Sequence, residues 1–145
     1  MECRIRDYLP GDFKNICTFW NEIGLGGKER KDTPEVILRT LKFEGKLLIL
    51  ENPDNKEIVG TSWLTCDGRR IHVHHFGIKE KYRNQGLGKL LAKESIKYAK
   101  NKRYQLRLDV EKNNTLAKKL YESFGFYAYT GYYIYVLRDI ENTEI

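Results

Sequence analysis

One short stretch limits the folds open to this chain more than any other feature. It reads YRNQGLGKLLAK from Tyr82 to Lys93, and it sets two glycines directly before a leucine-periodic segment. An apolar strand is predicted before it, over Arg70–Ile78, and another after it, over Tyr104–Val110. A helix from about Leu87 to Lys100 separates the two strands. We therefore expect the strands to be parallel neighbours joined by a helical crossover.

Local patterns place the remaining elements. Thr33 followed by Pro34 predicts the start of a helix, because Thr can cap a helix and Pro suits its first position. A hairpin turn is expected at Asp67-Gly68. Apolar periodicity predicts the others. They are the strand Cys3–Arg6, the helix Pro10–Ile23, the strands Lys46–Glu51 and Glu57–Thr65, a helix over Thr115–Phe124 and aromatic strands within Phe126–Arg138.

The resulting order of elements is β-α-α-β-β-β-α-β-α-β-β. It predicts an α/β fold, of the mixed α+β kind, in which helices pack on a mixed sheet. The 145 residues fit one domain of ordinary size, and neither a repeat nor a linker divides them. A hydrophobic content of 41% and a charged content of 32% are typical of a globular chain.

Neither a membrane protein nor a disulfide scaffold is expected. The longest aliphatic run, Leu47–Leu50, is far too short to span a bilayer, and the first four residues lack the apolar core of a signal peptide. Cys3, Cys17 and Cys66 are odd in number and widely spaced, which argues against a disulfide framework and against a zinc site. A reducing cytoplasm is the expected location.

The net charge of +6 favours an anionic partner without identifying it. Nucleic acid, a membrane surface and a phosphate-rich cofactor all qualify. Lysines recur at helical spacing at positions 89, 93, 97 and 100, where a solvated helix face is favoured over a phosphate-facing stripe. No RNA-binding aromatic motif and no zinc-finger pattern accompanies the charge, so nucleic acid is the minor interpretation.

The glycine stretch has the chemistry of an anion-binding loop. It joins a strand to a helix, where unpaired backbone N–H groups attract phosphate, and Gly86 and Gly88 let the backbone approach an anion closely. A Rossmann fingerprint is excluded because Leu91 stands where its third glycine belongs. A P-loop is excluded because Leu90 replaces its Ser or Thr. The remaining pattern, Arg-x-x-Gly-x-Gly, is also compatible with a turn that binds no ligand.

Two blocks of sequence resolve that choice through a family resemblance. Phe76-Gly77-Ile78, then Tyr82-Arg83-Asn84-Gln85-Gly86-Leu87-Gly88 and Leu90-Leu91, resemble the acetyl-CoA-binding segment of the GNAT superfamily of N-acetyltransferases. Asn114, Ala117, Leu120-Tyr121-Glu122 and Phe124-Gly125-Phe126 resemble its later helix and strand. The ribosomal-protein N-terminal acetyltransferases are the most similar members. The resemblance implies one domain over residues 1–145, with a mostly antiparallel central sheet, a splayed parallel strand pair and helices on both faces.

The resemblance also implies where acetyl-CoA binds. Backbone amides between Arg83 and Lys89 would hold the pyrophosphate, and the pantetheine arm would enter the gap between the splayed strands. There the backbone of Phe76 and Ile78 would pair with the arm, and Asn114 would contact it unless it serves only as a helix cap. The implied cofactor-binding residues are Phe76, Gly77, Ile78, Arg83, Asn84, Gln85, Gly86, Leu87, Gly88, Lys89, Asn114 and Tyr121.

Acetyl transfer to an amine requires a proton donor and a proton acceptor. Tyr121 matches the family's usual donor to the departing CoA sulfur, although a tyrosine on an apolar helix face is otherwise a core residue. Several residues compete for the role of base. Asp109 stands where the ribosomal relatives carry a glutamate and is favoured for that reason, while His72 and His74 lie on the other splayed strand. By strand alternation His75 should point to the opposite face unless a bulge shifts the register, so no metal site is expected among the histidines.

The implied function is acetyl-CoA-dependent N-acetylation of a protein N-terminus, a lysine or a small amine, by a monomer or homodimer with no membrane partner and no metal. A CoA-binding module without catalysis is the alternative. Acceptor specificity is expected from the Gly24–Arg30 loop, the second helix and the strands around Tyr127–Tyr135. The tyrosines there either line a cleft or simply reflect β-propensity.

Overall fold

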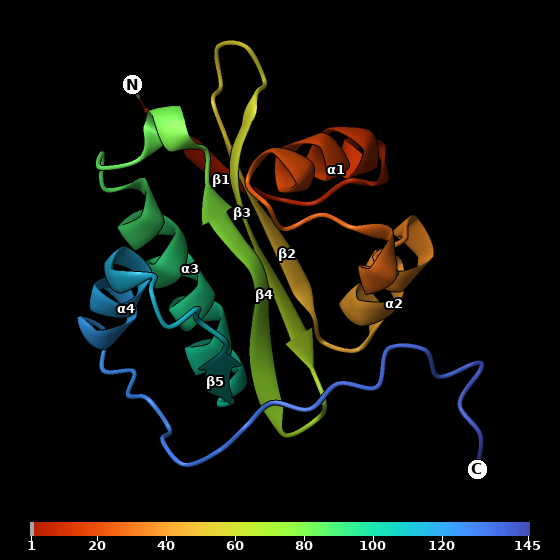
Figure 1. Ribbon diagram of the computed structural model, residues 1–145. Helices are drawn as coiled ribbons and strands as arrows, with labels where there is room; N and C mark the ends of the chain where they lie inside the picture. Colours follow the sequence, from red (N-terminus) through yellow and green to blue (C-terminus); the bar gives the residue numbers. More distant parts are fainter. Residues whose placement is uncertain (1) are drawn as a thin grey trace.

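The computed structural model describes residues 2–145 and contains a five-stranded sheet in the order β1-β2-β3-β4-β5 (Figure 1). Neighbouring strands are antiparallel except β4 and β5, which run parallel as the crossover predicts. The strands are β1 Arg4–Asp7, β2 Lys46–Glu51, β3 Ile58–Cys66, β4 Arg70–Ile78 and β5 Gln105–Leu108. The expected mixed, mostly antiparallel sheet is confirmed.

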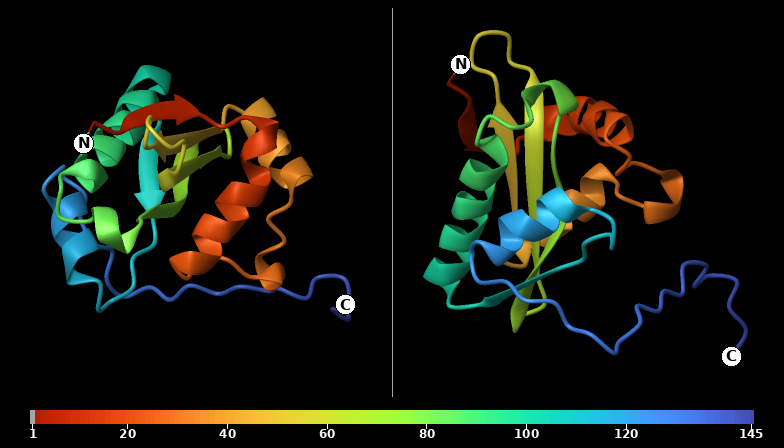
Figure 2. Two further views of the ribbon diagram at one scale, coloured as in Figure 1. Left: turned by 90° about the horizontal axis from the view of Figure 1, so that it is seen from above. Right: turned by 60° about the vertical axis from the view of Figure 1, so that its left-hand side comes forward.

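Helices cover both faces of the sheet. Helices α1 (Phe13–Glu22) and α2 (Pro34–Lys42) lie on one face, and α3 (Leu87–Lys102) and α4 (Thr115–Glu122) lie on the other (Figures 1 and 2). The lysine stripe of α3 is exposed along its length, as a solvated helix face requires. Within residues 2–145, no helix combines the length and the apolar character needed to cross a membrane.

Side-chain caps start two of the helices where the sequence predicts them. The Thr33 hydroxyl accepts a hydrogen bond from the backbone N–H of Val36 at 3.3 Å, and Pro34 occupies the first position of α2. At α4, the side-chain oxygen of Asn114 accepts the N–H of Ala117 at 3.1 Å. Each cap satisfies a backbone donor that the helix itself leaves unpaired.

The face under α1 and α2 holds an aromatic core whose two indole N–H groups are hydrogen-bonded. The indoles of Trp20 and Trp63 stack with ring centroids 5.8 Å apart. Their N–H groups donate to the hydroxyls of Thr61 and Thr40, each at 2.9 Å. Around them pack the buried side chains of Tyr8, Ile16, Phe19, Ile37, Leu47, Ile49 and Ile58. The hydrogen bonds remove the cost of burying two indole N–H groups.

A β-bulge corrects the expected orientation of the histidines. The pairing of β3 with β4 shifts register between Thr61 and Trp63, and His75 adopts a positive φ of 46°. The Thr61 hydroxyl donates to the His75 carbonyl at 2.7 Å, which holds this distorted backbone in place. Because the bulge interrupts the alternation of the strand, the rings of His74 and His75 both lie beside Trp63. The prediction that His74 and His75 cannot share a face is therefore wrong.

The aromatic strands predicted within Phe126–Arg138 are also absent. Beyond Phe126 the chain is irregular and extended, and it crosses below the sheet toward the side of α2 (Figures 1 and 2). Aromatic and β-branched residues favour a strand only when a neighbouring strand offers a pleated surface and backbone partners. No strand of residues 2–145 pairs with this segment, and β5 remains the edge of the sheet.

Candidate active site

The two parallel strands separate near the centre of the molecule. β5 pairs with β4 only from Arg70 to Val73, whereas β4 continues to Ile78. Beyond Val73, no strand within residues 2–145 occupies this side of β4. The backbone along His74–Ile78 therefore presents an open edge that an extended molecule could join by hydrogen bonding.

The glycine loop lies at the end of this open edge. Gly86 has a φ of 79° and directly precedes α3, and a Cβ added there would meet no atom within 4 Å. The first turn of α3 carries no acidic residue, so the positive end of the helix dipole and its unpaired N–H groups are uncompensated. Arg83 Nε donates to the Ile78 carbonyl at 3.0 Å, which ties the loop to the end of β4. These features suit an anionic group seated at the start of α3.

Glu57, which precedes β3, anchors the turn that leads into the loop. Its carboxylate accepts the Tyr82 hydroxyl at 2.7 Å, the Lys79 ammonium at 3.0 Å and the Lys81 ammonium at 3.1 Å. These bonds, led by the one from Tyr82, lower the pKa of Glu57 from 4.5 to about 2 despite its partial burial. Sequence analysis missed Glu57, because its partners are more than twenty residues away along the chain.

Tyr121, on α4, points into the gap where β4 and β5 separate. α4 places its ring 5.6 Å from the ring of Phe76 on β4 and 5.6 Å from that of Phe126, measured between centroids. The side chain is buried, and burial raises the pKa of its phenol above the ordinary value. A small apolar cavity between β4, β5, α3 and α4 has Tyr121, Phe76, Val73 and Leu108 among its lining residues. Tyr121 is thus both a core residue and a protonated phenol at the strand divergence.

The three candidate bases, His72, His74 and Asp109, form one cluster on the face of β4 opposite Tyr121. His72 Nε2 lies 3.5 Å from Asp109 Oδ2, and the rings of His72 and His74 are 4.1 Å apart. His74 Nε2 shares a 2.8 Å hydrogen bond with the Thr65 hydroxyl. Burial, followed by the neighbouring histidines, lowers the pKa of His74 to about 4. Burial also lowers the pKa of His72, while Asp109 opposes this shift. Both imidazoles are therefore neutral near pH 7 and able to accept a proton.

His75 and Asp32 form a second buried contact that the sequence did not predict. Their Nε2 and Oδ2 atoms lie 2.9 Å apart, without hydrogen-bond geometry. The His75 side chain is only 7% exposed, and its ring centroid lies 4.2 Å from that of Trp20. Asp32 comes from the loop before α2, so only the bulge in β4 brings the two residues together. Within residues 2–145, no three His, Cys, Asp or Glu side chains are grouped as metal ligands would be.

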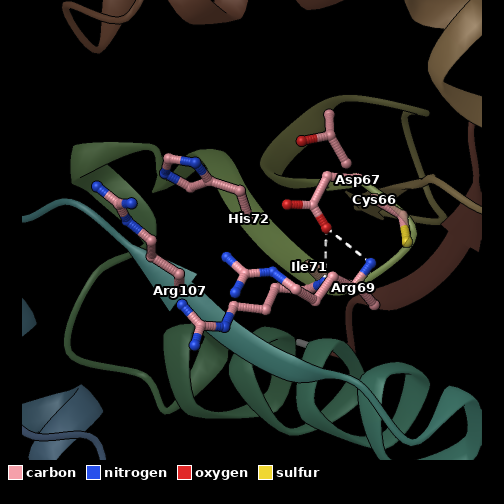
Figure 3. Close-up of a pocket in the computed structure, with 8 residues that line it drawn as sticks. Cys66, Asp67, Arg69, Ile71, His72 and Arg107 are labelled. Carbon is pink, nitrogen blue, oxygen red and sulfur yellow. Dashed lines mark hydrogen bonds between the residues drawn. The ribbon is translucent and has the colours of Figure 1, made fainter.

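A basic pocket adjoins the histidine cluster. It holds about 230 Å³ between the β3–β4 hairpin and β5, and His72 forms part of its wall (Figure 3). Sequence analysis singled out none of its arginines, because two follow a hairpin turn and the third lies on another strand. The lining residues are Thr65, Cys66, Asp67, Arg69, Arg70, Ile71, His72 and Arg107.

Comparison with known proteins identifies a family that the chain matches. Residues 13–126 match the family described as Acetyltransferase (GNAT) family. The mycothiol acetyltransferase of Jonesia denitrificans is 36% identical over 76 residues, which are 50% of this chain and 24% of that protein. The chain therefore spans about a quarter of the length of this relative.

Solved structures share the fold at low sequence identity. A GNAT-family acetyltransferase from Staphylococcus aureus superposes with a TM-score of 0.74 at 20% identity, covering 84% of this chain and 81% of that one. The structure of AAC(6')-Iy in complex with the bisubstrate analogue CoA-S-monomethyl-acetylneamine superposes with a TM-score of 0.74 at 16% identity, covering 95% and 99% of the two chains.

Glu57 should make the stability of the protein depend on acidity. The pKa of its carboxyl is lowered on folding, so its contribution is complete above about pH 4.5 and is lost as the pH falls toward 2. At neutral pH we expect Glu57→Gln to lower the free energy of unfolding by on the order of 2 kcal/mol. Urea denaturation from pH 7 down to pH 2 should show this difference shrinking below about pH 4.5.

The exposed Glu111 provides a matched control, because Glu111→Gln removes the same charge without touching the turn. A difference between wild type and Glu57→Gln that stays constant down to pH 2 would contradict the assignment.

Proposed function

Because the chain belongs to the acetyltransferase (GNAT) family, we propose that it transfers an acetyl group from acetyl-CoA to a primary amine. The main support is the pair of proton-handling groups on either side of the strand divergence. A buried, protonated Tyr121 stands on one side, and two neutral histidines with Asp109 stand on the other. The free cysteines, Cys3, Cys17 and Cys66, suit a reducing cytoplasm.

In this proposal the loop and the open strand edge hold acetyl-CoA. Backbone amides from Arg83 to Lys89 bind the pyrophosphate at the start of α3, where the space beside Gly86 is open. The β4 segment Phe76-Gly77-Ile78 lines the pantetheine arm along its backbone. Asn114 keeps its side-chain oxygen on the α4 cap, which leaves its amide NH₂ group to reach the arm.

Two residues carry the proton transfers. His72 accepts a proton from the acceptor ammonium, and Asp109, 3.5 Å away, stabilises the imidazolium that forms. The freed amine nitrogen attacks the thioester carbon, a C–N bond forms, and the C–S bond breaks. Tyr121 gives its proton to the departing thiolate, and the second proton that the nitrogen loses restores the Tyr121 phenol, so the products are the amide and CoA thiol. His74 keeps His72 in place through their ring contact.

The acceptor is a protein N-terminus, a lysine or a small amine. Similarity to the ribosomal-protein N-terminal acetyltransferases favours the first of these, although Asp109 stands where those relatives carry a longer glutamate. A screen of peptides, lysine-containing proteins and small amines with acetyl-CoA, read by release of CoA thiol, tests the proposed function. Binding of acetyl-CoA without thiol release for any acceptor class would instead support a CoA-binding module without catalysis.

Tyr121→Phe should separate the catalytic role of the residue from its packing role. The ring that contacts Phe76 and Phe126 remains, so we expect the folded state to be retained. Loss of the proton donor should lower turnover by ~10²–10⁴-fold while the affinity for acetyl-CoA barely changes. Tyr98→Phe is the control, because its hydroxyl donates to the Glu44 carbonyl, far from the gap. Wild-type turnover in Tyr121→Phe would remove this tyrosine from the mechanism.

Asp109→Asn should move the pH profile of the reaction. The Asp109 carboxylate raises the pKa of His72 against the effect of burial, so its removal should lower that pKa further. We therefore expect the acidic limb of kcat/KM to shift to lower pH and the rate above it to fall. His72→Gln should abolish this limb. If His72→Gln keeps the limb and only Asp109→Asn abolishes it, then Asp109 itself is the base.

A further inference from the structure

The basic pocket beside His72 has the chemistry of an anion site. Arg69 and Arg107 line it from the β3–β4 hairpin and from β5 (Figure 3). Arg70, the first residue of β4, also lines it. The parallel register pairs His72 with Arg107 and Arg70 with Gln105, so both strands contribute to the same wall. Guanidinium groups arranged around one hollow match the geometry of carboxylate and phosphate oxygens.

The local carboxylates do not neutralise these arginines. Asp67 Oδ1 accepts the backbone N–H groups of Arg69 and Arg70 at 2.8 Å and 2.7 Å, so this oxygen serves the hairpin turn. Asp109 Oδ1 lies 3.9 Å from a terminal nitrogen of Arg107, which is a weak contact. Within residues 2–145, the guanidinium groups of Arg69 and Arg70 form no ion pair. The pocket therefore keeps an excess of positive charge.

The position of the pocket connects it to the reaction. His72 lines the pocket and also contacts Asp109 in the cluster that takes the proton from the amine. An acceptor whose nitrogen reaches His72 would extend its other end toward the arginines. We propose that the acceptor amine carries an anionic group, a carboxylate or a phosphate, which the arginines of this pocket bind. This inference rests on the proposed function for the identity of the reacting group.

Paired acceptors test the proposal. Acetylation rates are measured for O-phosphoethanolamine against ethanolamine and for β-alanine against propylamine, at saturating acetyl-CoA. We expect kcat/KM to be at least about tenfold higher for the anionic member of one pair, since a charge-assisted contact is worth about that factor. The pair that shows the preference separates phosphate from carboxylate. Arg70→Gln and Arg107→Gln should each reduce the preference, whereas Lys97→Gln, on the exposed face of α3, should not.

A binding measurement separates failure of this inference from failure of the proposed function. Inorganic phosphate and β-alanine are titrated into the protein with and without CoA, and the imidazole signals of His72 are followed by NMR. Binding of either probe that Arg70→Gln weakens supports the pocket even if no amine is acetylated. Acetylation of neutral and anionic amines at equal rates, together with anion binding that Arg70→Gln leaves unchanged, overturns the pocket and leaves acetyl transfer intact.

Discussion

The arrangement of the candidate site depends on where the parallel pairing of β4 and β5 stops. Four residues of β5 pair with β4, and β4 then continues alone past Val73 to Ile78. This early end of the ladder leaves backbone groups of β4 open on one side. It also lets α4 bring Tyr121 against Phe76. A longer β5 would satisfy the strand edge and close the gap.

Burial supplies the acid and base character of the groups around this gap. The same loss of water raises the pKa of the Tyr121 phenol and lowers the pKa values of His72 and His74, since in each case the uncharged form is favoured. The phenol therefore keeps a proton to give, and the imidazoles stay free to take one. Asp109 opposes this effect at His72, where it is the first opposing cause, and also at His74. The two kinds of group lie on opposite faces of β4.

Positive charge is distributed over two distinct ends of the molecule. At one end, the uncompensated start of α3 and the loop before it suit a phosphate, and Glu57 holds the turn that positions them. At the other end, arginines from the hairpin and from β5 surround a pocket next to His72. The net charge of +6 alone does not distinguish these sites from a nucleic-acid surface. Their separation, with the proton-handling groups between them, fits two small anionic partners better than one long polyanion.

The sequence by itself determined the elements whose signals are local. Periodicity, caps and turn residues predicted the parallel crossover, the start of α2 at Thr33-Pro34 and the glycine loop before α3, and the two motif blocks indicated the family. Only the tertiary structure decided the bulge at His75, the contact of His72 with Asp109, the Glu57 anchor and the arginine pocket. Each of these depends on residues far apart in the chain, and register between strands is not encoded in any short window. The unpaired segment after Phe126 has the same cause, because β-propensity becomes a strand only where a partner edge is present.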